Sequence, residues 1–366
     1  MRILYVGMKF DYGKPTQGLS FEHYTFFETF RHIGMDIIYF DFISLLQKYG
    51  REKMNQLLLD VVTAEKPDLL FSILFTNEFA PETIAQITSS KKVVTLNWFC
   101  DDHWRFESYS KMWAPCFNWV VTTAQSALPK YKKIGYGNVI KSQWACNHFV
   151  YQKQDMPLIY DVTFVGQPHG NRRDVIGKLR QAGISVQTWG QGWENGRLSQ
   201  ADMIRVFNQS RINLNLANSS VQSYMFLRRI LRRVTRAIPS LTAPCDVFNK
   251  FLDKLTRDNL QVSQIKGRTF EIPGCGGFLL TEAAENLDEY FLPGREAVTF
   301  LNSQDLISKV QYFLSHENER RKIADLGYHR TIKDHTYVHR FRSIFNLMGL
   351  GCEIKPGQLG SLSEIS

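Results

Sequence analysis

One short segment in the second half of the chain combines charged side chains with closely spaced glycines. Its residues of interest are Lys266, Arg268, Glu271, Gly274, Gly276 and Gly277. The lysine and the arginine suit phosphate oxygens, and the glutamate suits the paired hydroxyls of a ribose. Glycines behind them would leave backbone N–H groups uncovered and let a ligand approach closely. The segment therefore predicts a nucleotide site, although Glu271 alone could be a helix-start carboxylate favoured by the helix dipole.

A second phosphate site is expected where the apolar residues 162–166 lead into a helix that begins near Arg172. The amides at a helix N-terminus and a forked guanidinium group suit a diphosphate. The alternative is an ordinary turn between a strand and a helix, with solvated arginines. Gly166 ends a strand, where open α/β sheets bind ligands, and this position favours the binding interpretation. Gly190 ends a neighbouring strand, so it could line the pocket for the base or the sugar.

Three consecutive titratable residues, Asp101, Asp102 and His103, follow an expected strand in the first half of the chain. Neighbouring carboxylates can raise one pKa, so one of these side chains could act as a general base for an acceptor hydroxyl. His23 and Glu22, at the start of the first expected helix, are rival bases. A loop that only caps the next helix is an alternative of nearly equal weight. A metal site is less favoured because the two aspartates are adjacent.

These candidates must be positioned by strands and helices, and apolar runs predict both along the whole chain. Short apolar runs separated by helical patterns are typical of parallel sheets covered on both faces. In the first half the expected strands are residues 2–7, 37–40, 67–74, 93–98, 119–122 and 139–141, with Ser20 capping the first helix. In the second half they are 162–166, 186–189, 212–216, 278–280 and 297–300, with helices from 172, 200, 303, 317 and 337. The expected fold class is α/β, with two Rossmann-like doubly wound domains.

Length and composition agree with two domains. At 366 residues the chain exceeds the usual single core. The polar residues 151–157 are the expected linker between a first domain at 1–150 and a second at 158–335, followed by a last helix and tail at 336–366. The six cysteines include no Cys-x-x-Cys pair, and no run approaches the roughly 20 apolar residues of a membrane helix. We expect a cytoplasmic protein, without a disulfide framework or zinc site, whose N-terminus is a strand and not a signal peptide.

The nucleotide segment resembles the donor pocket of GT-B-type glycosyltransferases, and the motifs around it extend the resemblance to a family. Those motifs are Trp98-Phe-Cys-Asp-Asp102, Trp144-Ala-Cys-Asn147, Asp161-Val-Thr-Phe-Val-Gly166, residues 285–300, Asp305-Leu306, His316-Glu-Asn-Glu-Arg320 and His335-Thr-Tyr-Val-His-Arg340. In their order and spacing they resemble the CgeB-like (YkvP/CgeB) glycosyltransferases over most of the chain. The resemblance implies a nucleotide-sugar donor, metal-independent transfer and two Rossmann-like domains facing a cleft.

The resemblance also bears on single residues. Arg172 is preferred to Arg173 because it aligns with the arginine of the family's Gly-x-Arg motif. The commonest retaining GT-B enzymes carry another glutamate eight positions before the one that Glu271 matches, and this chain has Ser263 there. The contact of that glutamate with the donor sugar is therefore not carried over. The last helix, from about Tyr337, is expected to cross back to the first domain.

An insertion at residues 221–262 departs from a minimal second domain. Its clustered arginines are Arg228, Arg229, Arg232, Arg233 and Arg236. The insertion holds eight Lys and Arg against three Asp, a net charge of +5 out of +9 for the chain. Basic amphipathic helices attract anionic lipid, so the protein could bind a membrane surface at its periphery. A packed helical hairpin is an equally weighted alternative, and nucleic-acid binding is not expected because no recognition motif accompanies the charge.

We therefore expect a glycosyltransferase that moves a sugar from a nucleoside-diphosphate sugar to an acceptor that the sequence does not identify. A cell-surface polysaccharide, a protein or a small molecule would each be compatible. No metal and no cofactor besides the donor substrate are expected. The alternative is a non-catalytic GT-B-like protein that binds a nucleotide or a glycan. A nucleotide-sugar 2-epimerase is a less favoured third function, since it would need carboxylates flanking the sugar.

Overall fold

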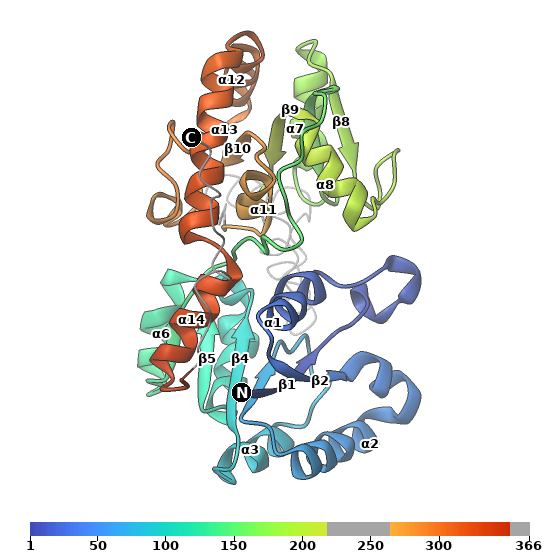
Figure 1. The fold of residues 1–366 in the computed structure, drawn as a ribbon, viewed down its shortest axis with the longest axis vertical. Helices are drawn as coiled ribbons and strands as arrows, with labels where there is room; N and C mark the ends of the chain where they lie inside the picture. Colours follow the sequence, from blue (N-terminus) through green and yellow to red (C-terminus); the bar gives the residue numbers. More distant parts are fainter. Residues whose placement is uncertain (218–263, 352–366) are drawn as a thin grey trace, which may run out of the picture. The chain divides into compact units, whose positions relative to one another are not determined.

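The computed structural model describes residues 1–217 and 264–351, and the chain divides into two compact units (Figure 1). Unit 1 holds Met1–Gln152 together with the described residues from Tyr328 onward, and unit 2 holds Lys153–Gly327. The basic insertion expected at 221–262, Ser263 and the end of the chain from residue 352 lie outside the described residues. Within the described ranges, no helix combines the length and the apolar character needed to cross a membrane.

Unit 1 is built on a six-stranded parallel sheet. Its strands, in spatial order, are β2 (Asp36–Asp41), β1 (Arg2–Gly7), β3 (Leu69–Ser72), β4 (Val94–Phe99), β5 (Trp119–Thr122) and β6 (Val139–Lys141). Leu4 of β1 lies between Ile38 of β2 and Leu70 of β3. The chain passes from β1 to β2 on one side and then crosses to β3 on the other. The carboxyl ends of β1 and β3 therefore form the switch point of the sheet, where open α/β sheets bind ligands.

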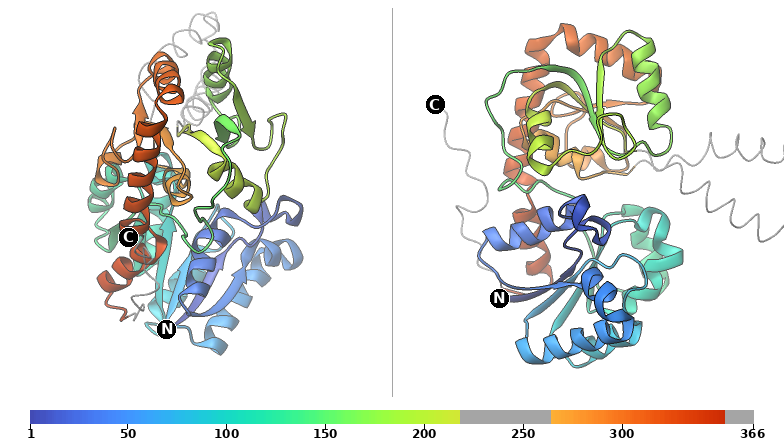
Figure 2. Two further views of the ribbon diagram at one scale, coloured as in Figure 1. Left: turned by 45° about the horizontal axis from the view of Figure 1, so that its top comes forward. Right: turned by 90° about the vertical axis from the view of Figure 1, so that its right-hand side faces the viewer.

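Helices cover both faces of this sheet (Figure 2). On one face α2 (Phe42–Glu65) and α3 (Pro81–Ser89) pack with Leu4 and Val6 into one hydrophobic cluster. Side chains alternate along a strand, so Tyr5 points to the other face and packs against Phe30 of α1 (Glu28–His32). On that face Phe341 of α14 (Tyr337–Leu347) stacks on Phe30, with ring centroids 4.2 Å apart. The described C-terminal helix thus packs on the sheet that begins the chain.

Short helical elements complete unit 1, and two of them are π-helical. The π-helical turns are η3 (His23–Phe27), which leads into α1, and η4 (Phe106–Ser110). The remaining elements are η1 (Asp11–Gly13), η2 (Pro15–Gln17), α4 (Asp102–Arg105), α5 (Lys111–Trp113), η5 (Ala114–Cys116), η6 (Gln125–Ala127) and α6 (Leu128–Lys133). Single π-helical turns are rare and occur often at functional sites.

Unit 2 repeats the architecture with a five-stranded parallel sheet. Its strands, in spatial order, are β11 (Val298–Phe300), β10 (Leu279–Glu282), β9 (Ser210–Asn215), β7 (Tyr160–Val165) and β8 (Val186–Trp189). The described helices of this unit are α7 (Arg172–Gln181), α8 (Gln200–Asn208), α11 (Arg268–Gly274), η7 (Leu287–Glu289), α12 (Ser303–Ser315) and α13 (Glu317–Asp334), which continues into unit 1. Here the strand order reverses at β7, so the switch point lies at the carboxyl ends of β7 and β9.

The two faces of the unit 2 sheet differ in polarity. Ile212 and Leu214 of β9 pack into an apolar cluster with side chains of α7 and α12. On the other face Asn213 accepts a hydrogen bond from the Thr163 hydroxyl at 3.1 Å. The Asn215 amide donates to the hydroxyls of Thr269, in α11, at 3.1 Å and Thr281, in β10, at 3.0 Å. A buried hydrogen-bonded network, rather than apolar packing alone, therefore fixes α11 on the sheet.

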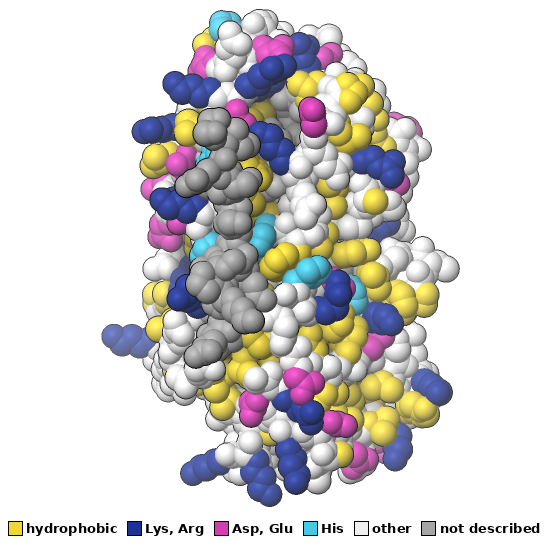
Figure 3. All heavy atoms as spheres, viewed as in Figure 1, with side chains coloured by type: hydrophobic (Ala, Val, Ile, Leu, Met, Phe, Trp, Pro, Cys, Tyr) yellow, Lys and Arg dark blue, Asp and Glu magenta, His cyan; other side chains and the backbone are white. Residues whose placement is uncertain are grey.

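The expected α/β fold class is confirmed, with two parallel sheets that each carry helices on both faces. Several elements begin or end where the sequence predicted them: α7 spans Arg172–Gln181, β8 spans Val186–Trp189, and α13 begins at Glu317. On the face drawn in Figure 3, the described Lys and Arg side chains are scattered among Asp and Glu. The described part of that face is thus unlike the dense basic segment expected at 221–262.

Candidate active site

A cavity of about 110 Å³ lies at the carboxyl edge of the unit 1 sheet. Its wall includes residues that directly follow β1, β3 and β4, so the cavity lies at the switch point. Its polar lining consists of Glu22, Asp101, Arg105, Tyr109 and Ser110. Both π-helical turns border it, because Glu22 precedes η3 and Tyr109 belongs to η4. Two carboxyl groups and one guanidinium group therefore line a cavity whose wall is otherwise largely apolar.

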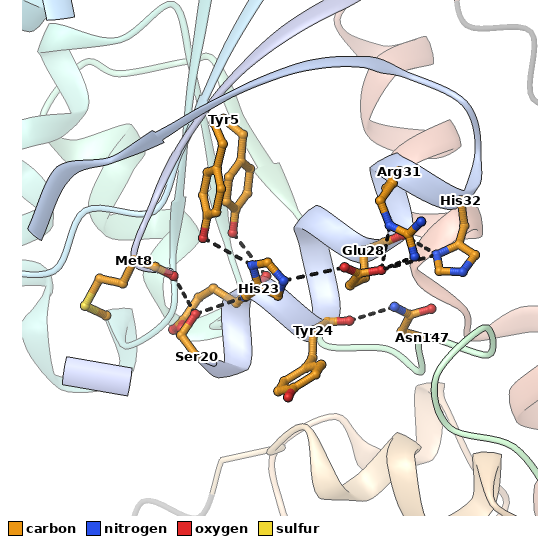
Figure 4. A network of polar contacts seen from close by, with 11 residues as sticks. Tyr5, Met8, Ser20, His23, Tyr24, Glu28, Arg31, His32 and Asn147 are labelled. Atoms are coloured by element: carbon orange, nitrogen blue, oxygen red, sulfur yellow. Dashed lines mark hydrogen bonds and ion pairs between the residues drawn. The ribbon is translucent and has the colours of Figure 1, made fainter. Parts of the chain in front are cut away.

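Ser20 fixes the position of Glu22. As predicted, Ser20 caps the first helix: its hydroxyl accepts a hydrogen bond from the His23 amide at 3.0 Å (Figure 4). The same hydroxyl donates to the carbonyl of Met8, just past β1, at 2.5 Å. The Tyr5 hydroxyl donates to the Glu22 carbonyl at 3.0 Å. The start of the helix is therefore tied to the end of β1, and Glu22 is held at the cavity wall.

Glu22 is half-buried, and its burial raises the pKa of the carboxyl group to about 7. The negative charges of Asp11 and Asp101 raise the pKa further, while hydrogen bonds from the Glu22 backbone and Ser20 lower it. A carboxyl group with a pKa near 7 suits proton transfer at neutral pH. Of the rival bases, Glu22 thus combines position in the cavity with a suitable pKa.

His23 does not line this cavity. Its ring is buried, with Nε2 3.5 Å from the Glu28 carboxylate and Nδ1 3.4 Å from the Tyr39 hydroxyl. Figure 4 shows the ring inside this polar network. Burial lowers the pKa of His23, and Glu28 partly offsets this effect. Both ring nitrogens have partners within unit 1, which argues against the predicted role of His23 as a base.

The three consecutive residues of the predicted acceptor loop separate in the structure. Asp101 lines the cavity and precedes α4, whereas Asp102 is completely buried and accepts a hydrogen bond from the Tyr131 hydroxyl at 2.7 Å. Burial raises the pKa of Asp102, and hydrogen bonds from Ser110, Thr122 and Tyr131 oppose that rise. Asp102 is not part of the cavity lining, so the structure does not support its predicted role as a base. His103 is half-buried and is not part of the cavity lining.

In unit 2 the switch point is bridged by Arg172. Its Nη1 donates to the carbonyl of Gln167, after β7, at 2.8 Å, and its Nη2 donates to the carbonyl of Leu216, after β9, at 2.5 Å. The guanidinium group lies 5.5 Å from the centre of the Phe164 ring. Burial lowers the pKa of Arg172; Glu282 raises it and Arg268 lowers it. Arg172 therefore lies within electrostatic range of two further charged residues at this edge.

Arg268 and Glu271 form an ion pair on α11. The Glu271 side chain is 0% exposed and the Arg268 side chain 26% exposed, so the arginine is the partner that solvent reaches. Oε2 of Glu271 binds Nη1 of Arg268, while Oε1 has no hydrogen-bond partner among the described residues. We call Arg172, Arg268, Glu271 and Glu282 the arginine–glutamate cluster. Lys266 is half-buried and begins the turn into α11, where its carbonyl accepts from Thr269.

The glycines after Glu271 serve the protein and do not offer free amides. Gly276 has φ +73°, and its N–H donates to the Pro273 carbonyl at 2.8 Å. The Gly277 N–H donates to the Ile272 carbonyl at 3.0 Å. These two bonds form the Schellman motif that ends α11, a helix whose last residue is the buried Gly274. The prediction of uncovered N–H groups at Gly276 and Gly277 is therefore wrong.

Gly166 and Gly190 also allow two protein segments to approach each other. A Cβ atom on Gly190, which has φ +138°, would lie 2.3 Å from the Gly166 carbonyl oxygen. The amides of Gly166 and Gly190 donate to the carbonyls of Trp189 and Gly196 at 2.8 and 2.7 Å. Both glycines thus shape the loops after β7 and β8 at the edge that carries Arg172.

Two features of the site escaped the sequence analysis. The polar residues Asn213 and Asn215 alternate with Ile212 and Leu214 in β9, and this period of two could have predicted a polar face. No local sequence pattern indicated that Glu282 would lie near Arg172. Across residues 1–217 and 264–351 there is no group of three or more His, Cys, Asp or Glu side chains arranged to hold a metal ion.

Comparisons with known proteins agree with this architecture. Residues 172–346 match the family model described as glycosyl transferase-like. The spore protein CgeB of Bacillus subtilis (strain 168) is 21% identical over 280 residues, which cover 75% of this chain and 81% of that protein.

Two solved structures share the fold over most of their length. HepE of Anabaena, in complex with UDP-glucose, has a TM-score of 0.60 at 12% identity, covering 95% of this chain and 99% of that one. A glycosyltransferase from Rickettsia africae ESF-5 has a TM-score of 0.58 at 9% identity, covering 96% and 99%. The resemblance of this chain to the CgeB-like glycosyltransferases is thus confirmed, and its two parallel sheets are those of the GT-B fold.

Proposed function

We propose that the protein transfers a sugar from a nucleoside-diphosphate sugar to an acceptor hydroxyl. The observation that carries this proposal is the arginine–glutamate cluster at the switch point of unit 2, where Arg172 spans the ends of β7 and β9. HepE, which shares the fold, has been crystallised with UDP, with UDP-glucose, and with UDP and glucose. A UDP-hexose is therefore the donor class that we propose for this chain.

The donor would be held by groups of opposite charge. Arg172 and Arg268 supply forked guanidinium groups for the diphosphate, at the edge where open sheets bind ligands. Glu271 supplies a carboxylate for the ribose hydroxyls, and its Oε1 atom has no hydrogen-bond partner among the described residues. Leaving such an atom unpaired costs about 1–3 kcal/mol, which a ligand hydroxyl would recover. Arg268 lies beside Glu271, so it would turn toward the diphosphate when the ribose binds.

Unit 1 would supply the base for the acceptor. A hydroxyl group in the cavity would donate its proton to the Glu22 carboxylate as its oxygen attacks the sugar carbon. Arg105 lines the same cavity, with its Nη2 donating to the Phe75 carbonyl at 2.8 Å. The leaving diphosphate would be stabilised by Arg172 and Arg268, so we propose that transfer needs no divalent cation.

A nucleotide screen tests this function. Ligands that bind only the folded protein raise its melting temperature, and UDP should do so more than ADP, GDP or CDP. UDP-hexoses that stabilise the protein should then release UDP slowly in the absence of acceptor, through hydrolysis. Binding without any release would support the non-catalytic alternative. A protein that no nucleotide stabilises would overturn the proposal.

A further inference from the structure

A second, larger pocket of about 510 Å³ lies in unit 2, at the opposite edge of its sheet. It opens where β9 begins at Ser210 and β10 at Leu279, whereas the arginine–glutamate cluster lies beyond the carboxyl ends of the strands. Its charged lining includes Lys153, Arg211, Arg320 and Arg321. Because the strands are parallel, the pocket and the cluster lie at different edges and form separate sites.

Arg320 is the most deeply placed charge in this pocket. It lies in the first turn of α13, and its side chain is 2% exposed. Its Nη1 donates to the Phe313 carbonyl at 2.6 Å, while Nη2 makes no hydrogen bond with any described residue. The Glu317 carboxylate lies 3.8 Å from Nη2. A buried cation without full hydrogen bonding is costly, so a polar ligand would stabilise it.

The pocket lining carries four basic side chains against two acidic ones, Asp155 and Asp325. Glu317 is shared by three arginines: its carboxylate lies 2.5 Å from Arg321, 3.5 Å from Arg211 and 3.8 Å from Arg320. Asp161, which like Glu317 lies outside the lining, pairs with Arg211 at 3.2 Å, so Arg320 and Arg321 share the Glu317 carboxylate. Lys153 and Asp325 pair with each other at 2.9 Å and cancel.

We propose that this pocket binds a small phosphate-bearing ligand, with Arg320 and Arg321 donating to the phosphate group. A phosphate dianion presents several acceptor oxygens to more than one guanidinium fork, which a single carboxylate does less well. Met156, Leu158 and Phe278 line the rest of the pocket and would pack against the body of the ligand. A volume of about 510 Å³ is within the usual range for small-molecule sites.

The test measures the melting temperature of the full-length protein in inorganic phosphate, acetate or chloride at equal ionic strength. Phosphate should stabilise the wild type more than the other two anions. Arg320→Gln and Arg321→Gln should each weaken the response to phosphate about tenfold in concentration. Lys178→Gln removes one charge from an exposed ion pair on α7 and should respond like the wild type. Arg321 is 66% exposed, so its variant should fold even if loss of the buried Arg320 prevents folding.

The donor site requires its own control because it also takes phosphate in the proposed function. Arg172→Gln should keep the phosphate response of this pocket, and Arg321→Gln should keep the stabilisation by UDP. The inference is overturned if phosphate is no more effective than chloride or acetate. It is also overturned if Arg321→Gln responds to phosphate like the wild type. Failure of UDP to stabilise any of these proteins would contradict the proposed function and leave this site intact.

Discussion

The carboxyl edges of the two sheets share a topology but differ in charge. In unit 1 the switch point carries a cavity with two acidic side chains, of which Glu22 has its pKa raised to about 7. In unit 2 it carries Arg172 and Arg268, and the fully buried Glu271 forms an ion pair with Arg268. One edge is suited to accept a proton and the other to hold an anion. In the proposed function, the same fold therefore supports two tasks through the side chains that follow its strands.

The two edges also differ in how they hold their charged groups. Glu22 is positioned by backbone contacts at a helix start, and its own carboxyl remains at a cavity wall. Arg172 uses two of its donors to tie together the ends of β7 and β9. Removing Glu22 should therefore affect turnover and leave nucleotide binding unchanged, whereas removing Arg172 should affect both binding and local structure.

Glu22→Gln should give the largest effect, because it removes the proposed base and keeps the shape of the side chain. We expect kcat to fall by about 10²–10⁴-fold, the usual contribution of general base catalysis. Wild-type turnover should rise with pH through about 7, since the Glu22 carboxyl must lose its proton to act as a base. Steady-state kinetics between pH 5 and 9 would measure both effects. A Glu22→Gln enzyme with the wild-type rate would remove Glu22 from the mechanism.

Arg172→Gln should weaken UDP binding by about tenfold to a hundredfold, since hydrogen bonds to charged groups contribute roughly 1.5–3 kcal/mol. Arg173→Gln is the matched control, because Arg173 is exposed and donates to the Gly192 carbonyl at 2.5 Å. It should bind UDP like the wild type. Calorimetry on the three proteins decides between them. Equal loss in both variants would mean that general positive charge, and not the position of Arg172, binds the nucleotide.

Asp102→Ala should lower the free energy of unfolding without changing the catalytic pH profile. It leaves the buried Tyr131 hydroxyl without its acceptor, at a cost of about 1–3 kcal/mol. Asp101→Ala, at the half-buried neighbouring position, should change stability by less than about 0.5 kcal/mol. Urea unfolding would compare the two variants. If Asp102→Ala were as stable as the wild type but shifted the pH profile, Asp102 would act in catalysis after all.

Glu22 should also make the stability of the protein depend on pH. Its pKa is raised from 4.5 to about 7 in the folded state, so the folded protein holds this proton more tightly than the unfolded chain. The protonated Glu22 carboxyl group therefore makes its full contribution to the free energy of unfolding below pH 4.5, and this contribution is lost as the pH rises through 7. At pH 8 the free energy of unfolding of Glu22→Gln, measured with urea, should therefore exceed that of the wild type by on the order of 1–3 kcal/mol. No gain at pH 8 would show that Glu22 titrates normally.

A chelator should have the smallest effect. If arginines stabilise the leaving diphosphate, turnover in EDTA should stay within about twofold of the untreated rate. Loss of turnover that magnesium or manganese restores would contradict this division between the two edges. It would also return attention to Asp101 as a metal ligand.

Local patterns were sufficient for much of the fold and insufficient for parts of the site. Apolar runs predicted the strands because parallel strands are buried on both faces. The helical pattern that follows the strand at residues 162–166 predicted the start of α7 at Arg172. The role of Asp102 depends on Tyr131, which lies 29 residues further along the chain, so no local pattern could separate it from Asp101. The raised pKa of Glu22 likewise depends on burial against segments that follow three different strands.

For the glycines after α11, in contrast, a local pattern was sufficient to predict the structural role. A glycine directly after a helix is typical of a Schellman motif, and Gly276 with Gly277 completes one at the end of α11. A Cβ atom on Gly277 would also lie 2.8 Å from the Asn213 side chain, so tertiary packing requires this glycine too. The nucleotide interpretation of that segment now rests on Arg268 and Glu271 and not on free amides.

The division of tasks between the two edges is tested most directly by measuring UDP affinity and UDP-hexose turnover on the same preparations of three proteins. These are the wild type, Glu22→Gln and Arg172→Gln. Glu22→Gln is predicted to bind UDP with the wild-type Kd and to lose turnover, while Arg172→Gln is predicted to lose affinity for UDP. Loss of UDP affinity in Glu22→Gln, or wild-type affinity in Arg172→Gln, would contradict the account.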